Sequence, residues 1–205
     1  MTTRLAAALG LVASLAFASE ALAVPIPATD LDAWLTGGET SIGVSTDDFI
    51  ATSPTQTVGS LSNEVLFNST TGEYTYTHAV TPAGSGFLFN TEFAPPGFTN
   101  VAGWSFSSAA GAGGAGNDMD FAIDELFGRI LFRPIFDAGR FWEAGETITF
   151  FYVSTKGPGM GQYGLNGIGT ASSFAPVPEP GSIALLGSGL VGMYAAIRRR
   201  RNLHS

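Results

Sequence analysis

Between Val24 and Ser173, apolar and polar residues mostly alternate with a period of two, and turn-forming residues separate the alternating runs. This pattern is typical of β-strands, whose successive side chains point to opposite faces. The strands expected from it cover residues 63–67, 73–80, 86–93, 100–107, 130–136 and 146–154. Both faces of the last run are apolar, so we expect it near the middle of a sheet. The pattern predicts one mainly β, β-sandwich-like domain over residues 24–173.

Two local features refine this expectation. The first is a five-residue loop, Asn68–Gly72, which ends in glycine and predicts a hairpin between runs 63–67 and 73–80. The second is the stretch 118–129, where the spacing of acidic and apolar residues suits a short amphipathic helix. It is the one helix that we expect within the domain.

The N-terminal residues have the three parts of a secretory signal peptide. Arg4 supplies a positive charge, residues 5–17 form an uncharged apolar run, and Ala21 and Ala23 are the small residues of a signal peptidase site. We therefore expect residues 1–23 to be a signal peptide. Its partners would be the export translocon and signal peptidase, and the mature chain would begin directly after it.

A second uncharged segment covers residues 181–197. A helix of that length rises about 25 Å, close to the lower limit for crossing the hydrocarbon core of a membrane. It is followed by four basic residues, Arg198, Arg199, Arg200 and Arg201. By the positive-inside rule these residues stop transfer and keep the tail 198–205 in the cytoplasm. We expect one transmembrane helix, with the β-rich domain on the outer side.

The segment between the domain and this helix, residues 174–180, has proline at every second position from Pro176 to Pro180. Proline lacks a backbone N–H and restricts the residue before it, so the segment should be extended and accessible to an enzyme. The four residues that would be recognised are Val177, Pro178, Glu179 and Pro180. With the apolar span and the arginine run that follow, they resemble the PEP-CTERM sorting signal of Gram-negative bacteria that make extracellular polysaccharide.

The resemblance covers Val177–Arg201 and implies a partner, exosortase, a membrane-embedded cysteine peptidase that recognises the Pro-Glu-Pro residues. It also implies an inner-membrane single-pass intermediate, followed by transfer to the cell surface or extracellular matrix. Two alternatives have less support: a plain stop-transfer anchor would not need Pro178–Pro180, and a GPI signal normally ends without a basic run. An LPxTG-type sortase signal is excluded because that pentapeptide does not occur in the sequence.

Composition limits what the domain can bind. The chain has no cysteine, which excludes disulfide bonds and thiolate metal sites. Between Val24 and Ala175 there are 15 acidic and four basic residues, a net charge of −11. Such a surface should repel nucleic acid and anionic membranes.

Several patterns could carry chemistry, and each has a simpler explanation. Gly111–Gly116 and Gly159–Gly164 both match the dinucleotide fingerprint G-x-G-x-x-G. Neither lies in a recognisable strand–turn–helix unit, so we expect flexible loops. The acidic residues around Asp118 and Asp120 could offer oxygen ligands to Ca²⁺, although a solvated acidic turn is the stronger expectation.

Enzymatic activity has little support in the sequence. His78 is the one histidine between residues 24 and 173, and its place on an aromatic strand face favours packing over catalysis. We expect no catalytic, cofactor-binding or metal-binding residues. Trp34, Trp104 and Trp142 could stack on sugar rings, although a place in the core is the more common use of tryptophan.

The function expected is that of an exported cell-surface or extracellular-matrix protein, serving as a structural or adhesive component of the envelope or exopolysaccharide matrix. A secreted carbohydrate-binding module is the alternative, and exopolysaccharide is the candidate ligand in that case.

Overall fold

The computed structural model describes residues 23–86, 88–105, 120–135 and 142–178, and almost all of its regular structure is β-strand. The strands are β1 Val24–Ile26, β2 Ala28–Asp30, β3 Glu39–Thr52, β4 Thr55–Asn68, β5 Glu73–Pro82, β6 Phe89–Thr91, β7 Phe98–Ser105, β8 Asp120–Leu126, β9 Arg129–Ile135, β10 Ile148–Ser154, β11 Pro158–Leu165 and β12 Gly169–Pro176. A four-residue helix, α1 Leu31–Trp34, follows β2. Asp30 caps it, because its carboxylate accepts the Asp32 backbone N–H at 2.8 Å.

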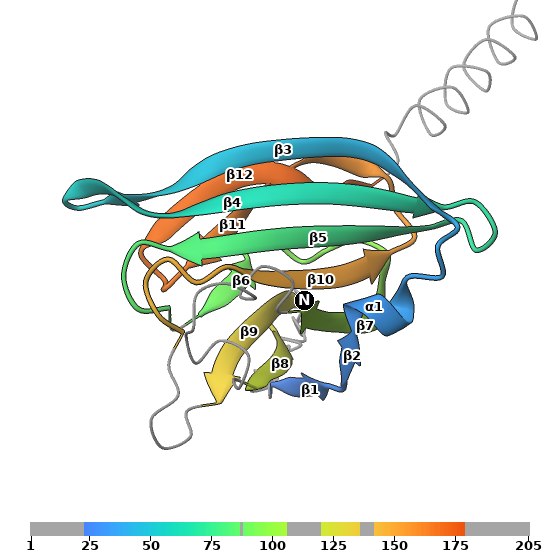
Figure 1. Cartoon of the computed structure of the whole chain (residues 1–205), viewed down its shortest axis with the longest axis horizontal. Coiled ribbons are helices and arrows are strands. Elements are labelled where there is room, and N and C mark those ends of the chain that lie inside the picture. Colours follow the sequence, from blue (N-terminus) through green and yellow to red (C-terminus); the bar gives the residue numbers. More distant parts are fainter. Residues whose placement is uncertain (1–22, 87, 106–119, 136–141, 179–205) are drawn as a thin grey trace, which may run out of the picture.

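All twelve strands belong to one sheet, in the order β1-β8-β9-β6-β11-β12-β3-β4-β5-β10-β7-β2. Neighbours are antiparallel, except that β2 runs parallel to β7. Figure 1 shows how the sheet curls: β3, β4, β5 and β10 form a front wall, and β11, β12, β6 and β9 lie behind it. The mainly β prediction is confirmed, and the two layers of the sandwich-like architecture are walls of a single, nearly closed sheet.

The N-terminal segment closes the curled sheet. β1 pairs with β8 at one end of the strand order, and β2 pairs with β7 at the other end. Only Pro27 separates β1 from β2, so the backbone directly connects the two edge strands of the sheet, which do not pair with each other. The segment thereby covers two strand edges that would otherwise expose unpaired backbone groups.

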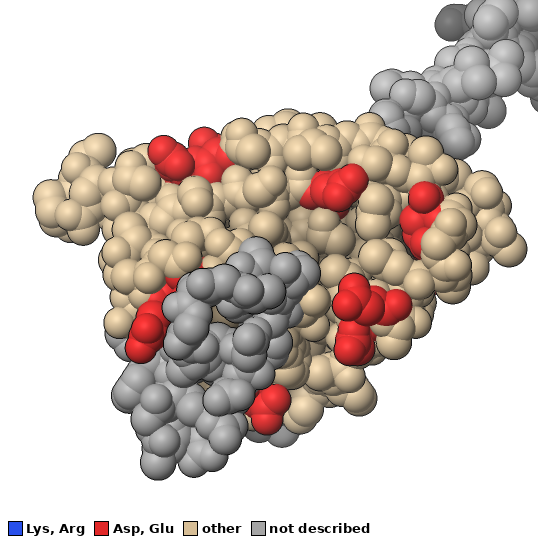
Figure 2. Space-filling view, in the orientation of Figure 1, with Lys and Arg blue, Asp and Glu red and all other residues tan. Residues whose placement is uncertain are grey.

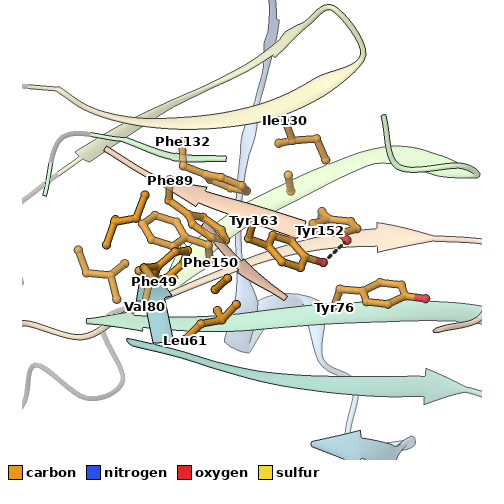
Figure 3. Close-up of a cluster of buried hydrophobic side chains, with 14 of the residues drawn as sticks. Phe49, Leu61, Tyr76, Val80, Phe89, Ile130, Phe132, Phe150, Tyr152 and Tyr163 are labelled. Atoms are coloured by element: carbon orange, nitrogen blue, oxygen red, sulfur yellow. Dashed lines mark hydrogen bonds between the residues drawn. The ribbon is translucent and has the colours of Figure 1, made fainter. Parts of the chain in front are cut away.

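Aromatic side chains fill the space between the walls (Figure 3). β10 lies between β5 and β7, and six of its seven residues are buried. The ring of Phe150 on β10 lies 5.0 Å from the ring of Phe89 and 4.9 Å from that of Phe132. Rings of this size contribute much of the hydrophobic stabilisation of a core. Residues 148–154 are thus an interior strand, paired on both edges, although β10 stands tenth of twelve in the strand order and not at its middle.

The hairpin predicted around residues 68–72 is also confirmed. β4 and β5 pair from Asn68 and Glu73 onwards, and the Gly72 N–H donates to the Asn68 carbonyl oxygen at 2.8 Å. Gly72 has a φ of 75°, in the left-handed region that favours glycine. The run expected at 86–93 is shorter in the structure, where β6 covers only Phe89–Thr91.

The helix expected over residues 118–129 is wrong. Residues 120–126 form β8, which pairs with β9 across a two-residue turn at Phe127 and Gly128. These two residues have φ values of 52° and 74°, as a type I′ hairpin turn requires. Phe121 and Ile123 alternate into the core, so burial with a period of two overrides the helix-like spacing.

The flexible loop expected at Gly159–Gly164 is wrong as well. These residues belong to β11, which pairs with β12 along its whole length. A continuous strand is not the strand–turn–helix unit that holds a dinucleotide, so the fingerprint has no structural support here. The second match, at 111–116, lies outside the described residues.

Both ends of the domain border segments that the structure does not describe. Within residues 23–178, apart from the gaps named above, no helix combines the length and hydropathy needed to cross a membrane. The span expected at 181–197 lies outside the described residues, as does most of the expected signal peptide. β12 extends to Pro176, so residues 174–176 of the segment expected between the domain and the helix belong to the sheet.

Candidate sorting site and the adjoining groove

β12 carries the chain directly to the predicted sorting residues. It remains paired with β11 up to Pro176, which lies opposite Pro158. Ala175 is 1% exposed and Pro176 is buried. The Val177 N–H then donates to the Gly157 carbonyl oxygen at 3.1 Å, whereas Pro178 is exposed. The described structure therefore extends to Pro178, the residue directly before Glu179.

A buried polar cluster holds the end of β12 against the core. The carbonyl oxygen of Phe174 accepts two hydrogen bonds, from the Tyr163 hydroxyl at 2.7 Å and from the Asn63 side-chain amide at 3.0 Å. The hydroxyl of Tyr152 lies 2.8 Å from that of Tyr163, as the dashed line in Figure 3 marks. Because Tyr163 donates to Phe174, Tyr152 donates to Tyr163. Five strands, β4, β5, β10, β11 and β12, meet through this cluster and His78.

His78 is the titratable member of the cluster. It is fully buried between the rings of Tyr152 and Tyr163, and burial lowers its pKa to about 3. The Asn63 amide nitrogen lies 2.8 Å from His78 Nδ1. Because that nitrogen donates, Nδ1 accepts and the ring proton is on Nε2. The packing role predicted for His78 is confirmed by its complete burial.

The tyrosines of the cluster also remain neutral. Burial raises the pKa of Tyr152 and of Tyr163 well above the usual value for a phenol. A neutral imidazole beside two neutral phenols gives a set of dipoles with no buried charge, which avoids the large cost of desolvating an ion. The cluster is therefore suited to holding strands together.

A groove of about 410 Å³ lies beside the end of β12. One wall is the segment after β6, from Glu92 to Pro96, and the other comprises Ala175–Pro178. Met160, Gly161 and Gln162 of β11 form its floor. The Glu92 N–H donates to the Gln162 carbonyl oxygen at 2.9 Å, so the first wall continues the pairing of β6 with β11.

Two glycines of β11 allow this close arrangement. A Cβ at Gly159 would overlap the side chain of Val177, and one at Gly161 would overlap Ala175 and lie 3.0 Å from the ring of Phe93. Because these two residues have no side chains, the end of β12 and the segment after β6 can both lie close to β11. The glycine-rich pattern noted in the sequence thus serves packing beside the sorting residues.

Apolar side chains line much of the groove. Met160 is 66% exposed on its floor, and Phe93, Ala94, Pro96 and Pro176 line its walls. Carboxylates are spread over the face of β3, β4 and β5, where Figure 2 shows no lysine or arginine among the residues described. An exposed apolar surface in an acidic protein is a common mark of a contact site.

The structure covers some of the predicted site residues and not others. Val177 and Pro178 lie at the rim of the groove, and Ala23 is exposed directly before β1. The remaining members of the predicted sites lie outside the described residues: Ala21, Glu179, Pro180, Arg198, Arg199, Arg200 and Arg201. The groove and the hydrogen bonds to Phe174 were not predicted. Their residues come from separate strands, and no local pattern in the sequence joins them.

The tryptophans proposed as sugar platforms are mostly used in packing. Trp142 is fully buried, and its indole N–H donates to the Glu146 carbonyl oxygen at 3.0 Å, so it cannot stack on a ligand. Trp104 is partly buried against Phe121, with ring centres 5.6 Å apart. Trp34 is also partly buried and donates to the Thr75 hydroxyl at 3.1 Å.

The acidic stretch considered for calcium is divided by the fold. Asp120 is exposed at the start of β8, whereas Asp124 is buried and forms an ion pair with Arg133. In the part of the chain that the structure describes, no group of three or more acidic or histidine side chains could hold a metal ion. Asp118 lies outside that part.

Comparison with known families identifies the segment that follows the groove. Residues 176–201 match the PEP-CTERM protein-sorting motif. The chain therefore carries a PEP-CTERM sorting motif. The match begins at Pro176, the last residue of β12, so the PEP-CTERM motif starts inside the folded domain. It indicates an exported protein that an exosortase sorts and processes. No curated protein and no solved structure matches the chain.

Proposed function

We propose that the β-domain of this PEP-CTERM protein is a structural or adhesive component of the cell envelope or exopolysaccharide matrix. In this proposal the chain passes through a single-span intermediate in the inner membrane, and exosortase acts near Pro178-Glu179-Pro180. The domain then remains at the cell surface or in the matrix. The proposal assigns it no catalytic activity.

One observation carries the proposal: the last strand of the fold leads into the sorting motif without an intervening linker. Pro176 is both the end of β12 and the first residue of the matched motif. In this proposal the domain is presented directly beside the site of processing. A compact, acidic body with an aromatic core is suited to persisting outside the cell, where no disulfide is available to stabilise it.

Processing can be tested with the double variant Pro178→Ala with Glu179→Ala in the native host. We expect full-length protein to accumulate in the inner membrane, whereas the wild-type chain is shortened and released from it. Immunoblots of membrane and surface fractions measure the ratio. A matched control, Pro82→Ala at the end of β5, removes a proline far along the sequence from the motif and should leave processing unchanged. Normal release of the double variant would contradict the proposal.

A carbohydrate-binding role is the second candidate, and one feature of the outer face favours it. A shallow depression of about 470 Å³ crosses β3, β4 and β5 and reaches Thr147, the residue before β10. Its lining is rich in hydroxyl and carboxylate groups, from Thr46, Asp47, Asp48, Ser60, Ser62, Thr81 and Thr147. Such groups can hydrogen-bond to sugar hydroxyls. Retention of the processed protein on the host's exopolysaccharide, lost in Asp48→Ala with Ser62→Leu, would support this candidate over a purely structural role.

A further inference from the structure

The groove beside β12 adjoins the residues that exosortase is proposed to recognise. Pro178 is part of its wall, and only Glu179 separates Pro178 from Pro180 in the sequence. An extended chain spans at most about 3.5 Å per residue, so Pro180 is within about 7 Å of Pro178. A peptidase that binds Pro178-Glu179-Pro180 in an extended form must therefore meet the walls of the groove or pull β12 away from them.

Pulling β12 away would be costly. The strand end would lose both hydrogen bonds to the Phe174 carbonyl oxygen and the bond from the Val177 N–H to Gly157. Tyr163 and Asn63 would then be left as buried polar groups without that acceptor, which is more expensive than the loss of an exposed hydrogen bond. The domain therefore favours an encounter in which the strand end stays in place.

We infer that this groove is a docking surface for the outward-facing side of exosortase, and that the enzyme recognises the folded domain together with the motif. The inference rests on the proposed function. The occupant must be apolar where it meets Met160, because this uncharged side chain is 66% exposed on the groove floor. Docking would hold the motif in register at the active site and lower the entropic cost of binding a short peptide.

The experiment compares two variants of the full chain in its native host. Met160→Glu places a charge on the groove floor at a residue that is 66% exposed. Ile168→Glu is the matched control: Ile168 is 57% exposed in the turn at the opposite end of the β11–β12 hairpin. Pulse–chase labelling measures the rate of processing. We expect Met160→Glu to slow it about tenfold, the effect of losing one buried apolar side chain at a contact, and Ile168→Glu to leave it unchanged.

The outcomes separate the inference from the proposal on which it rests. Equal rates for Met160→Glu and Ile168→Glu, with the Pro178→Ala and Glu179→Ala variant still blocked, would overturn docking and leave exosortase processing intact. Release of that double variant would overturn processing itself.

Tyr163→Phe provides a third comparison, because it removes one hydrogen bond to Phe174 and loosens the end of β12. Faster processing of Tyr163→Phe would show that the enzyme peels β12, which also overturns docking. Protease resistance of each full-length variant confirms that it is folded.

Discussion

The two ends of the described domain are both held by strand pairing, but by different means. At the N-terminal end, β1 and β2 have three residues each, and of these only Ile26 is buried. At the C-terminal end, β12 has eight residues, and the carbonyl oxygen of Phe174 accepts two hydrogen bonds from the interior. The N-terminal end closes the sheet from outside, whereas the C-terminal end is part of the core.

The largest effect is expected from damage to the C-terminal end. Tyr163→Ala removes a fully buried ring and both of its hydrogen bonds, and should lower the free energy of unfolding by about 4 kcal/mol. Tyr163→Phe keeps the ring and should cost only about 1–2 kcal/mol. Denaturant unfolding of the full chain in detergent measures both values. A loss below 1 kcal/mol for Tyr163→Ala would contradict the assignment of β12 to the core.

A smaller effect is expected from acid, through His78. Its pKa is about 3 in the folded chain and about 6.5 when unfolded, so the unfolded state takes up a proton first. The contribution of neutral His78 to the free energy of unfolding is therefore present in full above about pH 6.5 and is lost as the pH falls toward 3. At pH 5 the loss is about 2 kcal/mol relative to pH 7.

Glu39 also makes a pH-dependent contribution to stability, but it does so in a lower pH range than His78. Hydrogen bonds from Thr36 lower its pKa to about 2, so its contribution is lost only below about pH 4.5. The change between pH 6.5 and 4.5 therefore tests His78 without Glu39. An NMR titration should show the His78 ring still neutral at pH 5, and protonation of that ring near pH 6.5 would contradict its burial in the cluster.

The smallest effect is expected at the N-terminal end. A Cβ at Gly103 would overlap the carbonyl oxygen of Thr29 and the buried ring of Phe151, so Gly103→Ala should separate β2 from β7 and displace that ring. Because β2 is short and mostly exposed it can shift outward, whereas the Phe151 ring must move within the core, so we expect a loss of about 1.5 kcal/mol, within the usual range for overpacking. Hydrogen exchange should show faster exchange in β2 and unchanged protection in β12.

Gly84→Ala is the control for this variant, since a Cβ at Gly84 would have no atom within 4 Å. It should leave both stability and exchange unchanged. A loss of protection throughout the sheet in Gly103→Ala would show that closure at the N-terminal end stabilises the whole domain, and would remove the contrast between the two ends.

The sequence predicted strands from side chains that are neighbours in the chain. In β5, Tyr76, His78 and Val80 share a fully buried face, and β10 is an interior strand with two apolar faces. These features depend on side chains close together in the chain. The same is true of the sorting motif, whose residues are consecutive and needed no knowledge of the fold.

The features that were missed depend on contacts between distant residues. β8 has helix-like spacing but becomes a strand because β9 and β1 pair with its two edges. β11 contains glycines that suggest a loop, yet their lack of side chains is what lets Val177 and Ala175 lie against it. The groove combines residues from three segments of the chain, so its geometry could not be predicted from any one of them.

The closing strands also set the order in which the domain can be completed during export. β1 and β2 are the first strands in the chain, but their partners β8 and β7 lie about 100 and about 75 residues later. Contacts over such distances form slowly, because the intervening chain must first be ordered. β12, by contrast, directly follows its partner β11. β12 is the last strand in the chain and fills its place in the sheet just before the sorting motif follows, so exosortase encounters the motif on a domain whose strands have all been delivered.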